Sequence, residues 1–255
     1  MDPATIIGIV LAFVAIFASM ILEGGNPMAI FLLPPLLLVF VGTIGAGLAG
    51  GLLSDAKKSA AALKDAFMGA PTSADETVAT VVRLAESARR EGLLALESAV
   101  QDIEDAFLRQ GLQSAIDGAD PEELRDILYA QIDTKRAEDK RAAKFYADMG
   151  GYAPTIGIIG TVIGLVHVLE NLSEPAELGH LIAGAFVATL WGVLSANILW
   201  LPIASRLKRL SESACHQMEV AVEGVLAIQS GTSPRVVQEK LQSFLPPAPA
   251  QKEAA

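Results

Sequence analysis

Two long stretches of this sequence, residues 1–53 and 150–205, contain no lysine or arginine. All 19 basic residues lie elsewhere, 13 of them between Ser54 and Met149 and the other 6 after Ser205. A soluble globular protein carries charge over its whole surface, so this segregation argues against a soluble domain. With 52% apolar residues and a mean hydropathy of +0.44, the sequence predicts an integral membrane protein.

Other missing features exclude further classes of protein. The single cysteine, Cys215, excludes a disulfide framework, and no group of cysteine and histidine has the spacing of metal ligands. The formal net charge of −10 disfavours nucleic acid as a partner. No catalytic triad or cofactor motif stands out, so we predict that the chain is not an enzyme and needs no cofactor or metal.

Four stretches contain no charged side chain, namely residues 3–22, 24–54, 149–169 and 178–205. Each can cross a hydrocarbon core of ~30 Å, which takes about 20 helical residues. The first stretch could be a signal peptide, but it has no basic n-region and no small-residue cleavage site, which favours a retained helix. We assign the spans to residues 3–22, 29–51, 150–170 and 180–204.

The predicted fold is an all-α integral membrane protein with four transmembrane helices. A large helical cytoplasmic segment, residues 54–149, lies between spans two and three. Cytoplasmic loops hold most lysine and arginine, so both termini are expected in the cytoplasm. The cytoplasmic tail, residues 205–255, becomes rich in proline and alanine and is predicted to be disordered from about residue 246.

The cytoplasmic segment has a helical pattern. Apolar residues recur at intervals of three and four from residue 75 to 110, which predicts an amphipathic helix. Thr72 or Ser73 would cap its start, and Gly111 and Gly118 would break it. A further helix is expected to begin with Asp120 as its cap and to continue, through a charged stretch, into the third span.

No aspartate or glutamate lies in the interior of any span, since Glu170 is the last residue of span three, although an ion carrier usually needs a carboxylate within the membrane. If the protein moves ions, a partner must supply that group, and a secondary transporter acting alone is disfavoured. His167 and His180 lie near the outer ends of spans three and four. They are interpreted as interfacial residues, with a role in an ion relay as the alternative.

Several motifs carry a resemblance to a known family. They are residues 151–166, 171–175, 188–192 and 201–204 in and around the last two spans, residues 89–97 in the cytoplasmic segment, and residues 224–231 with 233–235 in the tail. Together they resemble the MotA/PomA family of flagellar stator proteins, within the MotA/TolQ/ExbB superfamily. The resemblance covers about residues 1–245.

The resemblance implies a stator subunit in the bacterial cytoplasmic (inner) membrane that couples the flow of sodium ions or protons to torque. In that family five subunits, a homopentamer in membrane lipid, surround two MotB/PomB chains, whose aspartate takes up the ion. The cytoplasmic loop pushes on the rotor protein FliG. The alternative is an ExbB/TolQ-type energiser of an envelope complex, but such proteins normally have three spans.

The resemblance also places Thr161 and Thr189 in the ion pathway, where a hydroxyl can ligate a partly dehydrated cation. The alternative is that each hydroxyl bonds to the carbonyl one turn earlier in its own helix. A threonine at position 161 resembles the sodium-driven members of the family. Ala188, beside Thr189, departs from the pair of adjacent threonines that those members have. The ion stays open, with a slight preference for sodium.

Three prolines match functional positions of the family. Pro154 and Pro202 lie at the cytoplasmic ends of spans three and four, where a bend could convert ion binding into movement. A plain helix boundary is the alternative reading, especially for Pro202. Pro175 corresponds to a proline in the outer turn.

Arg89, Arg90 and Glu97 correspond to the charges that face the rotor in the family. Their spacing of seven and eight residues predicts that they lie near one face of a helix, where a solvated surface is the other reading. Val100 and the apolar run at residues 31–35 depart from some relatives and weaken the transfer of individual residue roles.

Small residues recur along spans three and four at intervals that permit close helix packing in lipid. They are Gly157, Gly160, Gly164, Ala183, Gly184, Ala188 and Gly192. This packing could join neighbouring subunits of a ring or helices within one subunit.

Overall fold

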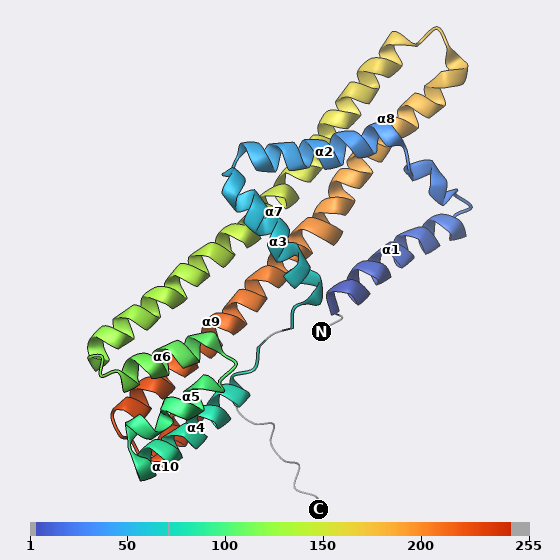
Figure 1. Ribbon diagram of the computed structural model, residues 1–255. Coiled ribbons are helices and arrows are strands. Elements are labelled where there is room, and N and C mark those ends of the chain that lie inside the picture. Colours follow the sequence, from blue (N-terminus) through green and yellow to red (C-terminus); the bar gives the residue numbers. More distant parts are fainter. Residues whose placement is uncertain (1–3, 71, 246–255) are drawn as a thin grey trace, which may run out of the picture. The chain divides into compact units, whose positions relative to one another are not determined.

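The computed structural model describes residues 4–70 and 72–245, and of Ala176 it describes only the backbone. This part of the chain is almost entirely helical and contains no strand (Figure 1). The elements are α1 (Ala4–Leu22), the 3-10 turn η1 (Pro27–Ile30), α2 (Leu33–Ala49), α3 (Leu53–Met68), α4 (Ala74–Glu91), the 3-10 turn η2 (Leu93–Leu96), α5 (Glu97–Gln101), α6 (Ala106–Ile116), α7 (Pro121–Glu170), α8 (Pro175–Ser195), the π segment η3 (Ala196–Trp200), α9 (Leu201–Gln229) and α10 (Pro234–Gln242). The tail from residue 246, predicted to be disordered, lies outside the described residues.

The helices form two compact units. The spanning unit comprises residues 1–70 and 138–210, and the charged unit comprises residues 71–137 and 211–255. The long helices α7 and α9 each contribute to both units. The expected continuation of the cytoplasmic helix into the third span is confirmed, because α7 runs without interruption for 50 residues.

Three helical stretches are long and apolar enough to cross a membrane, namely Ala4–Leu22 and parts of Pro121–Glu170 and Glu177–Gln229. The second predicted span corresponds to α2, whose 17 residues lie at the lower end of the length that crosses a bilayer, about 17–25 residues. The all-helical membrane fold is therefore as expected, with α2 as the shortest of the four apolar helices.

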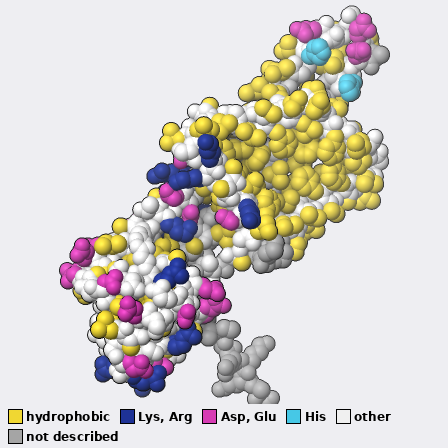
Figure 2. All heavy atoms as spheres, viewed as in Figure 1, with side chains coloured by type: hydrophobic (Ala, Val, Ile, Leu, Met, Phe, Trp, Pro, Cys, Tyr) yellow, Lys and Arg dark blue, Asp and Glu magenta, His cyan; other side chains and the backbone are white. Residues whose placement is uncertain are grey.

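The exposed surface of the spanning unit is itself apolar. α1 buries none of its residues, and large side chains such as Leu11, Ile158 and Phe186 are more than half exposed. Figure 2 shows this surface as a broad hydrophobic area without charged groups across its middle. Exposing such a large apolar surface to water is unfavourable, whereas the hydrocarbon core of a membrane covers it.

Aromatic side chains join the helices inside the spanning unit. Trp191 on α8 lies between Phe31 and Phe40, with ring centroids 5.6 and 5.9 Å away. Its indole nitrogen donates a hydrogen bond of 2.7 Å to the Ile30 carbonyl in η1. Because the indole N–H is satisfied by backbone of another element, it fixes α8 against the turn that precedes α2.

The charged unit has a separate aliphatic core. Leu112, Leu128, Val220 and Leu241, from α6, α7, α9 and α10, are fully buried in one cluster. Side chains cap the helices that build it. Ser73 accepts a hydrogen bond from the Asp75 amide at the start of α4, as one of the two predicted caps.

The cap predicted for the long helix is confirmed as well. One carboxylate oxygen of Asp120 accepts hydrogen bonds from the Glu122 and Glu123 amides, at 2.9 and 3.1 Å, at the start of α7. These bonds satisfy amides that have no partner within the first turn of a helix.

Gly92 and Gly111 differ from the prediction, because the apolar pattern predicts Gly92 inside a helix and Gly111 at the end of one. The helix expected over residues 75–110 ends at Glu91, because Gly92 adopts φ of 87°, which ends α4 and starts η2. Gly111, expected to break a helix, lies inside α6. An added Cβ there would meet Val225 at 3.2 Å and Leu128 at 3.3 Å, so the missing side chain permits close packing. Gly118, with φ of 85°, does follow the end of α6 as predicted.

The ends of the apolar helices also differ from the assigned ranges. The helix within the second predicted span, residues 29–51, starts at Leu33, because Asn26 caps the short turn η1 and the chain is extended at Leu32. The helix that contains the start of the last predicted span, residues 180–204, begins earlier, at Pro175, with proline in the first turn, where its missing N–H costs no hydrogen bond. No helix boundary separates the third span from the segment before it.

Candidate functional site

The contact between α7 and α8 is built from residues with little or no side chain. A Cβ added to Gly157 would lie 2.8 Å from the Ala188 carbonyl oxygen, and one added to Gly192 would lie 3.0 Å from the Gly157 Cα. Gly160 faces the Ala188 Cβ in the same way. The two backbones therefore touch, which only glycine on both helices allows.

The contact between α7 and α8 shows which of the small residues pack within one subunit. Gly157, Gly160, Gly164 and Gly192 pack within one chain, so the interpretation as packing within a subunit holds for them. Gly184 is different, because a Cβ there would meet only Leu32, at 3.9 Å. Ala183 is exposed. These last two residues therefore do not take part in the close packing of α7 against α8.

Thr161 and Thr189 meet at this crossing, and their hydroxyl groups are in hydrogen-bond contact with each other. The Thr161 hydroxyl also lies 3.1 Å from the Ala185 carbonyl oxygen, and both hydroxyls lie 3.3 Å from that of Gly157. The backbone bond one turn earlier is thus present for Thr161. For Thr189 the carbonyl belongs to the other helix.

The threonine pair has more possible contacts than protons to fill them. Each hydroxyl has one proton and two lone pairs. The pair therefore has two protons to donate, whereas three acceptor groups are within reach: the other hydroxyl, the Gly157 carbonyl and the Ala185 carbonyl. Lone pairs of at least one hydroxyl remain free for another donor or a cation. Both side chains are half-buried, so the pair can be reached from one side.

An apolar groove of about 580 Å³ runs beside the crossing. Its walls include Leu38 from α2, Ile163 from α7 and Ala188 from α8, and His167 and His180 line it as well. Both histidines are exposed, and the His167 Nδ1 lies 3.3 Å from a carboxylate oxygen of Glu170. Exposure agrees with the interpretation as interfacial residues.

The helix that contains Pro202 is continuous and is not bounded there, so the alternative of a plain boundary is wrong. The π segment η3 joins α8 to α9, and the Leu201 amide bonds to the Ala196 carbonyl five residues earlier. Pro202 follows directly and has no N–H to give to the preceding turn. A wide turn next to a missing hydrogen bond makes this the most irregular part of the helix.

Of the other two prolines, Pro175 has a common position for proline in a helix and Pro154 an uncommon one. Pro175 lies at the start of α8, where proline is favoured. Pro154 lies inside α7, within one turn of Gly157 at the crossing with α8. Pro154 therefore lies in the same helix as Thr161, about two turns before it.

The three charges predicted to face the rotor do not lie on one helix. Arg89 and Arg90 end α4, Gly92 breaks the chain direction, and Glu97 begins α5. The argument from a spacing of seven and eight residues is therefore wrong. All three side chains are exposed. Arg89 donates a hydrogen bond of 3.2 Å to the Gly231 carbonyl, while Arg90 and Glu97 form no ion pair within the described part of the chain.

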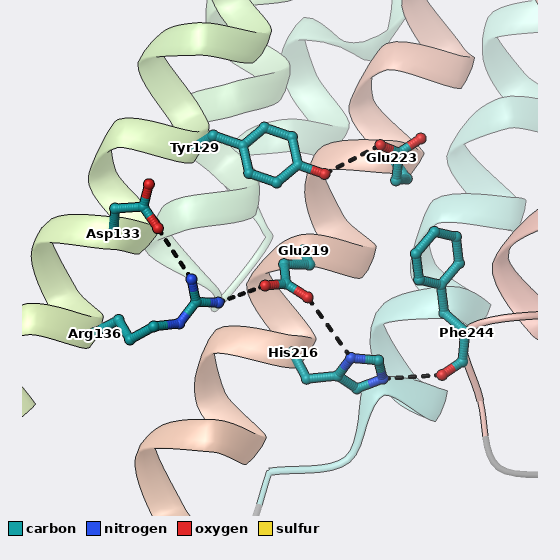
Figure 3. A network of polar contacts seen from close by, with 7 residues as sticks. All are labelled: Tyr129, Asp133, Arg136, His216, Glu219, Glu223 and Phe244. Carbon is teal, nitrogen blue, oxygen red and sulfur yellow. Dashed lines mark hydrogen bonds and ion pairs between the residues drawn. The ribbon is translucent and has the colours of Figure 1, made fainter. Parts of the chain in front are cut away.

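Sequence reasoning missed a polar network in the charged unit (Figure 3). Arg136 on α7 bridges Asp133 and Glu219, and the Tyr129 hydroxyl donates to Glu223 at 3.2 Å. Spacing on α7 could have indicated the Asp133 contact. The partners on α9 are more than 80 positions away, and no local pattern relates them.

Lysine and burial set the ionisation of this network. Burial opposes the charged form of Glu223, but the Lys240 ammonium, 2.6 Å away, and the Tyr129 hydroxyl keep the pKa of Glu223 below its ordinary value. Burial and the Glu223 carboxylate raise the pKa of Tyr129. The pair therefore stays as a carboxylate accepting from a neutral phenol, which ties α7, α9 and α10 together.

These features define a class of protein: a helical membrane subunit with a hydroxyl pair at the crossing of α7 and α8, within apolar stretches (residues 149–169 and 178–195) that contain no carboxylate. Comparison with known proteins identifies the family. Residues 99–220 match the MotA/TolQ/ExbB proton channel family, and residues 6–92 match the family described as Motility protein A N-terminal. The chain belongs to the MotA/TolQ/ExbB proton channel family.

Individual relatives agree along nearly the whole chain. Motility protein A of Bacillus subtilis (strain 168) is 38% identical over 247 residues, which cover 96% of this chain and 92% of that protein. The structure of C. jejuni MotAB superposes with a TM-score of 0.93 at 32% identity, covering 98% of each chain. The flagellar MotAB stator complex from Bacillus subtilis gives a TM-score of 0.88 at 38% identity, covering 96% of each chain.

Proposed function

We propose that this chain is a stator subunit of a flagellar motor, which couples ion flow across the bacterial cytoplasmic membrane to torque on a rotor. It works with a MotB/PomB-type partner, whose single span supplies the carboxylate that takes up the ion. The observation that carries the proposal is the threonine pair. Two hydroxyls meet at a tight helix crossing beside a groove, in stretches of α7 and α8 (residues 149–169 and 178–195) that contain no carboxylate.

The division of labour between the two proteins follows from desolvation. A carboxylate and a cation are both costly in hydrocarbon, and a hydroxyl can replace part of the ion's hydration at much lower cost. The partner then brings the charge, while Thr161 and Thr189 bring neutral oxygen ligands. Two solved structures that are similar to this chain are of complexes named MotAB, which supports a two-protein assembly.

The same reasoning gives the orientation and the remaining partners. The basic residues of the spanning unit cluster on α3, the middle of α7 and the start of α9, which favours a cytoplasmic position for that end and for both termini. Exposed Arg89, Arg90 and Glu97 are available to a rotor protein such as FliG. Several copies, five in the family, would surround the partner in membrane lipid.

An ExbB/TolQ-type energiser is the second candidate, since the matched family includes those proteins. The match of residues 6–92 to the N-terminal part of motility protein A favours the stator, as do the two apolar helices α1 and α2. We propose no catalytic activity for the chain. The transported ion, a proton or sodium, acts as cargo and needs no resident cofactor.

The proposal is tested by ion flux in liposomes that contain the purified chain with and without its partner. We expect little flux from the chain alone, because no titratable carboxylate lies within its described spans. Flux should appear with the partner and should disappear when the partner's membrane aspartate is changed to asparagine. Full-rate flux from this chain alone would contradict the proposal.

A further inference from the structure

A second cavity lies in the spanning unit, away from the threonine pair. It has a volume of about 380 Å³ and is walled by α1 on one side and by η3 with the start of α9 on the other. The residues of the wall are Ala4, Thr5, Gly8, Ile9, Ala12, Asn197, Ile198, Pro202, Ser205, Arg206 and Arg209. It shares no residue with the groove beside the threonine pair.

The walls of this cavity change from apolar to basic along the helices. Ile9 and Ala12 on α1 and Ile198 in η3 form an apolar part, whereas Arg206 and Arg209 lie further along α9. From Ile198 to Arg209 is eleven residues, or about 16 Å of helix at 1.5 Å per residue. A ligand that fills the space therefore needs an apolar portion and an anionic end.

The two arginines fit a phosphate group. A guanidinium binds phosphate through paired N–H donors, which makes arginine suited to this role. Arg206 donates a hydrogen bond of 2.9 Å to the Gly69 carbonyl, which orients its side chain. Arg209 is exposed and forms no ion pair with any residue that the structure describes, so its charge is available to a ligand.

The residues around the cavity also carry an excess of positive charge. Nine basic residues gather at this end of the spanning unit: Lys57, Lys58, Lys64, Lys140, Arg141, Lys144, Arg206, Lys208 and Arg209. Five acidic residues accompany them: Asp55, Asp65, Glu138, Asp139 and Asp148. Figure 2 shows basic groups beside the edge of the apolar surface. An excess of positive charge at that edge attracts anionic lipid.

We propose that the cavity between α1 and the η3–α9 segment binds an anionic phospholipid, with its phosphate on Arg206 and Arg209 and an acyl chain against α1. Lipid is the occupant because the cavity opens on a unit whose exposed surface is apolar, where α1 buries none of its residues. A free phosphate would leave the apolar wall unfilled, and an apolar helix would leave the exposed guanidinium of Arg209 without an anion.

The experiment uses the full-length chain purified with its partner in mild detergent. Native mass spectrometry measures the binding of added phosphatidylglycerol, with phosphatidylcholine as the zwitterionic comparison. We expect phosphatidylglycerol to bind in preference. Arg209→Gln should weaken its binding on the order of tenfold, because a charge-assisted contact to phosphate is lost. Arg141→Gln is the matched control, an exposed arginine of the same basic cluster outside the cavity, and should change binding by less than about twofold.

A second variant tests the apolar wall without altering charge. Gly8 lines the cavity, and an added Cβ there would meet no atom within 4 Å, so Gly8→Leu is accommodated and fills the space. It should displace the lipid as strongly as Arg209→Gln does, while flux through the threonine pair reports separately on the proposed function. Unchanged lipid binding in both variants would overturn the proposal. So would displacement of the ligand by millimolar inorganic phosphate with no effect of Gly8→Leu, which would identify a site for free phosphate.

Discussion

At the scale of single residues, the contact between the Thr161 and Thr189 hydroxyls is the main result. The resemblance to stator proteins pointed to both threonines, but not to their contact with each other. They lie 28 positions apart on different helices, and their alignment depends on the touching backbones at Gly157 and Gly192. Which glycines of two helices meet is a property of tertiary packing, which a single sequence does not specify.

The first residue-scale prediction concerns the ion. If the Thr161 hydroxyl ligates a partly dehydrated sodium ion, Thr161→Ala should abolish rotation that depends on sodium, because a lost oxygen leaves the dehydration uncompensated. Proton-driven rotation should survive with a modest loss. The measurement is the rotation speed of tethered cells against external sodium at constant pH.

Two controls accompany this measurement. Thr161→Ser keeps the hydroxyl and should restore most of the speed. Thr155→Ala removes a hydroxyl from the same helix that is exposed and bonds only to the Tyr152 carbonyl, at 2.8 Å, so it should have little effect. Wild-type speed that does not depend on sodium would disprove the preference for sodium. Dependence on sodium that persists in Thr161→Ala would remove Thr161 from the pathway.

A second residue-scale prediction tests the helix crossing itself. Gly157→Ala places a methyl group 2.8 Å from the backbone oxygen of Ala188, so α7 and α8 must separate. We expect a loss of stability of about 1–3 kcal/mol, as for other overpacked sites, together with slower rotation. Gly151→Ala, in the same helix but with no atom within 4 Å of the new methyl group, should be neutral or slightly stabilising.

The readout for this pair is the midpoint of thermal unfolding of the purified complex, followed by rotation speed. Both variants add the same methyl group to the same helix, so a difference between them reports the crossing. Equal midpoints for the two variants would show that the contact between α7 and α8 is looser than the structure indicates.

At the scale of elements, the segment from α4 to α5 shows what a sequence pattern can and cannot predict. The apolar pattern predicts a helix that continues through Gly92 and breaks at Gly111, and the structure has the reverse. Gly92 is exposed and turns the chain, whereas Gly111 is buried against Val225, a residue more than 100 positions away. The cap residues Ser73 and Asp120 were predictable because each acts on amides within three residues.

The prediction at this scale concerns the turn that carries the charges. Arg90→Glu and Glu97→Arg should each reduce swimming strongly while leaving the amount of assembled complex unchanged, since exposed charges contribute at most ~1 kcal/mol to stability. Arg83→Glu is a control on an exposed position of α4, two turns earlier, and should have a smaller effect. Swimming is measured in soft agar, and assembly by copurification with the partner.

Rescue distinguishes a direct rotor contact from an indirect effect. A charge reversal on the rotor protein that restores swimming to one of the two variants would indicate a direct contact. Arg89 is less suitable for this test, because it also bonds to the Gly231 carbonyl in the charged unit. Loss of the assembled complex in Glu97→Arg would assign that residue a structural role.

At the scale of the whole molecule, charge alone predicted most of the organisation. The positions of lysine and arginine divided the chain into apolar helices and a charged segment, residues 54–149. The structure instead divides that segment between its two units, because residues 54–70 and 138–149 belong to the spanning unit. Both units are discontinuous in sequence, because α7 and α9 pass from one to the other. The sequence did not reveal this division, since a continuous helix has no loop or composition shift at residues 137–138 or 210–211.

The opposite end of the spanning unit has the opposite character. Glu170, Glu174 and Glu177 lie in or beside the turn between α7 and α8, and no basic residue of the spanning unit lies near them in sequence. Figure 2 shows acidic and histidine side chains side by side at one end of the apolar surface. A negative surface raises the local concentration of cations. The two ends of the spanning unit therefore differ in the sign of their surface charge, and the acidic end is the one that attracts cations.

The π segment at residues 196–200 has a consequence for how the chain tolerates changes in length. A π turn contains one residue more than an α turn, so it shifts the side chains that follow by about 100°. Deleting one residue there converts the wide turn into an ordinary one and leaves the helix unbroken, whereas the same deletion beside Gly157 would disrupt the touching surface. Between homologous chains, a gap of one residue in this helix is therefore expected within residues 196–200.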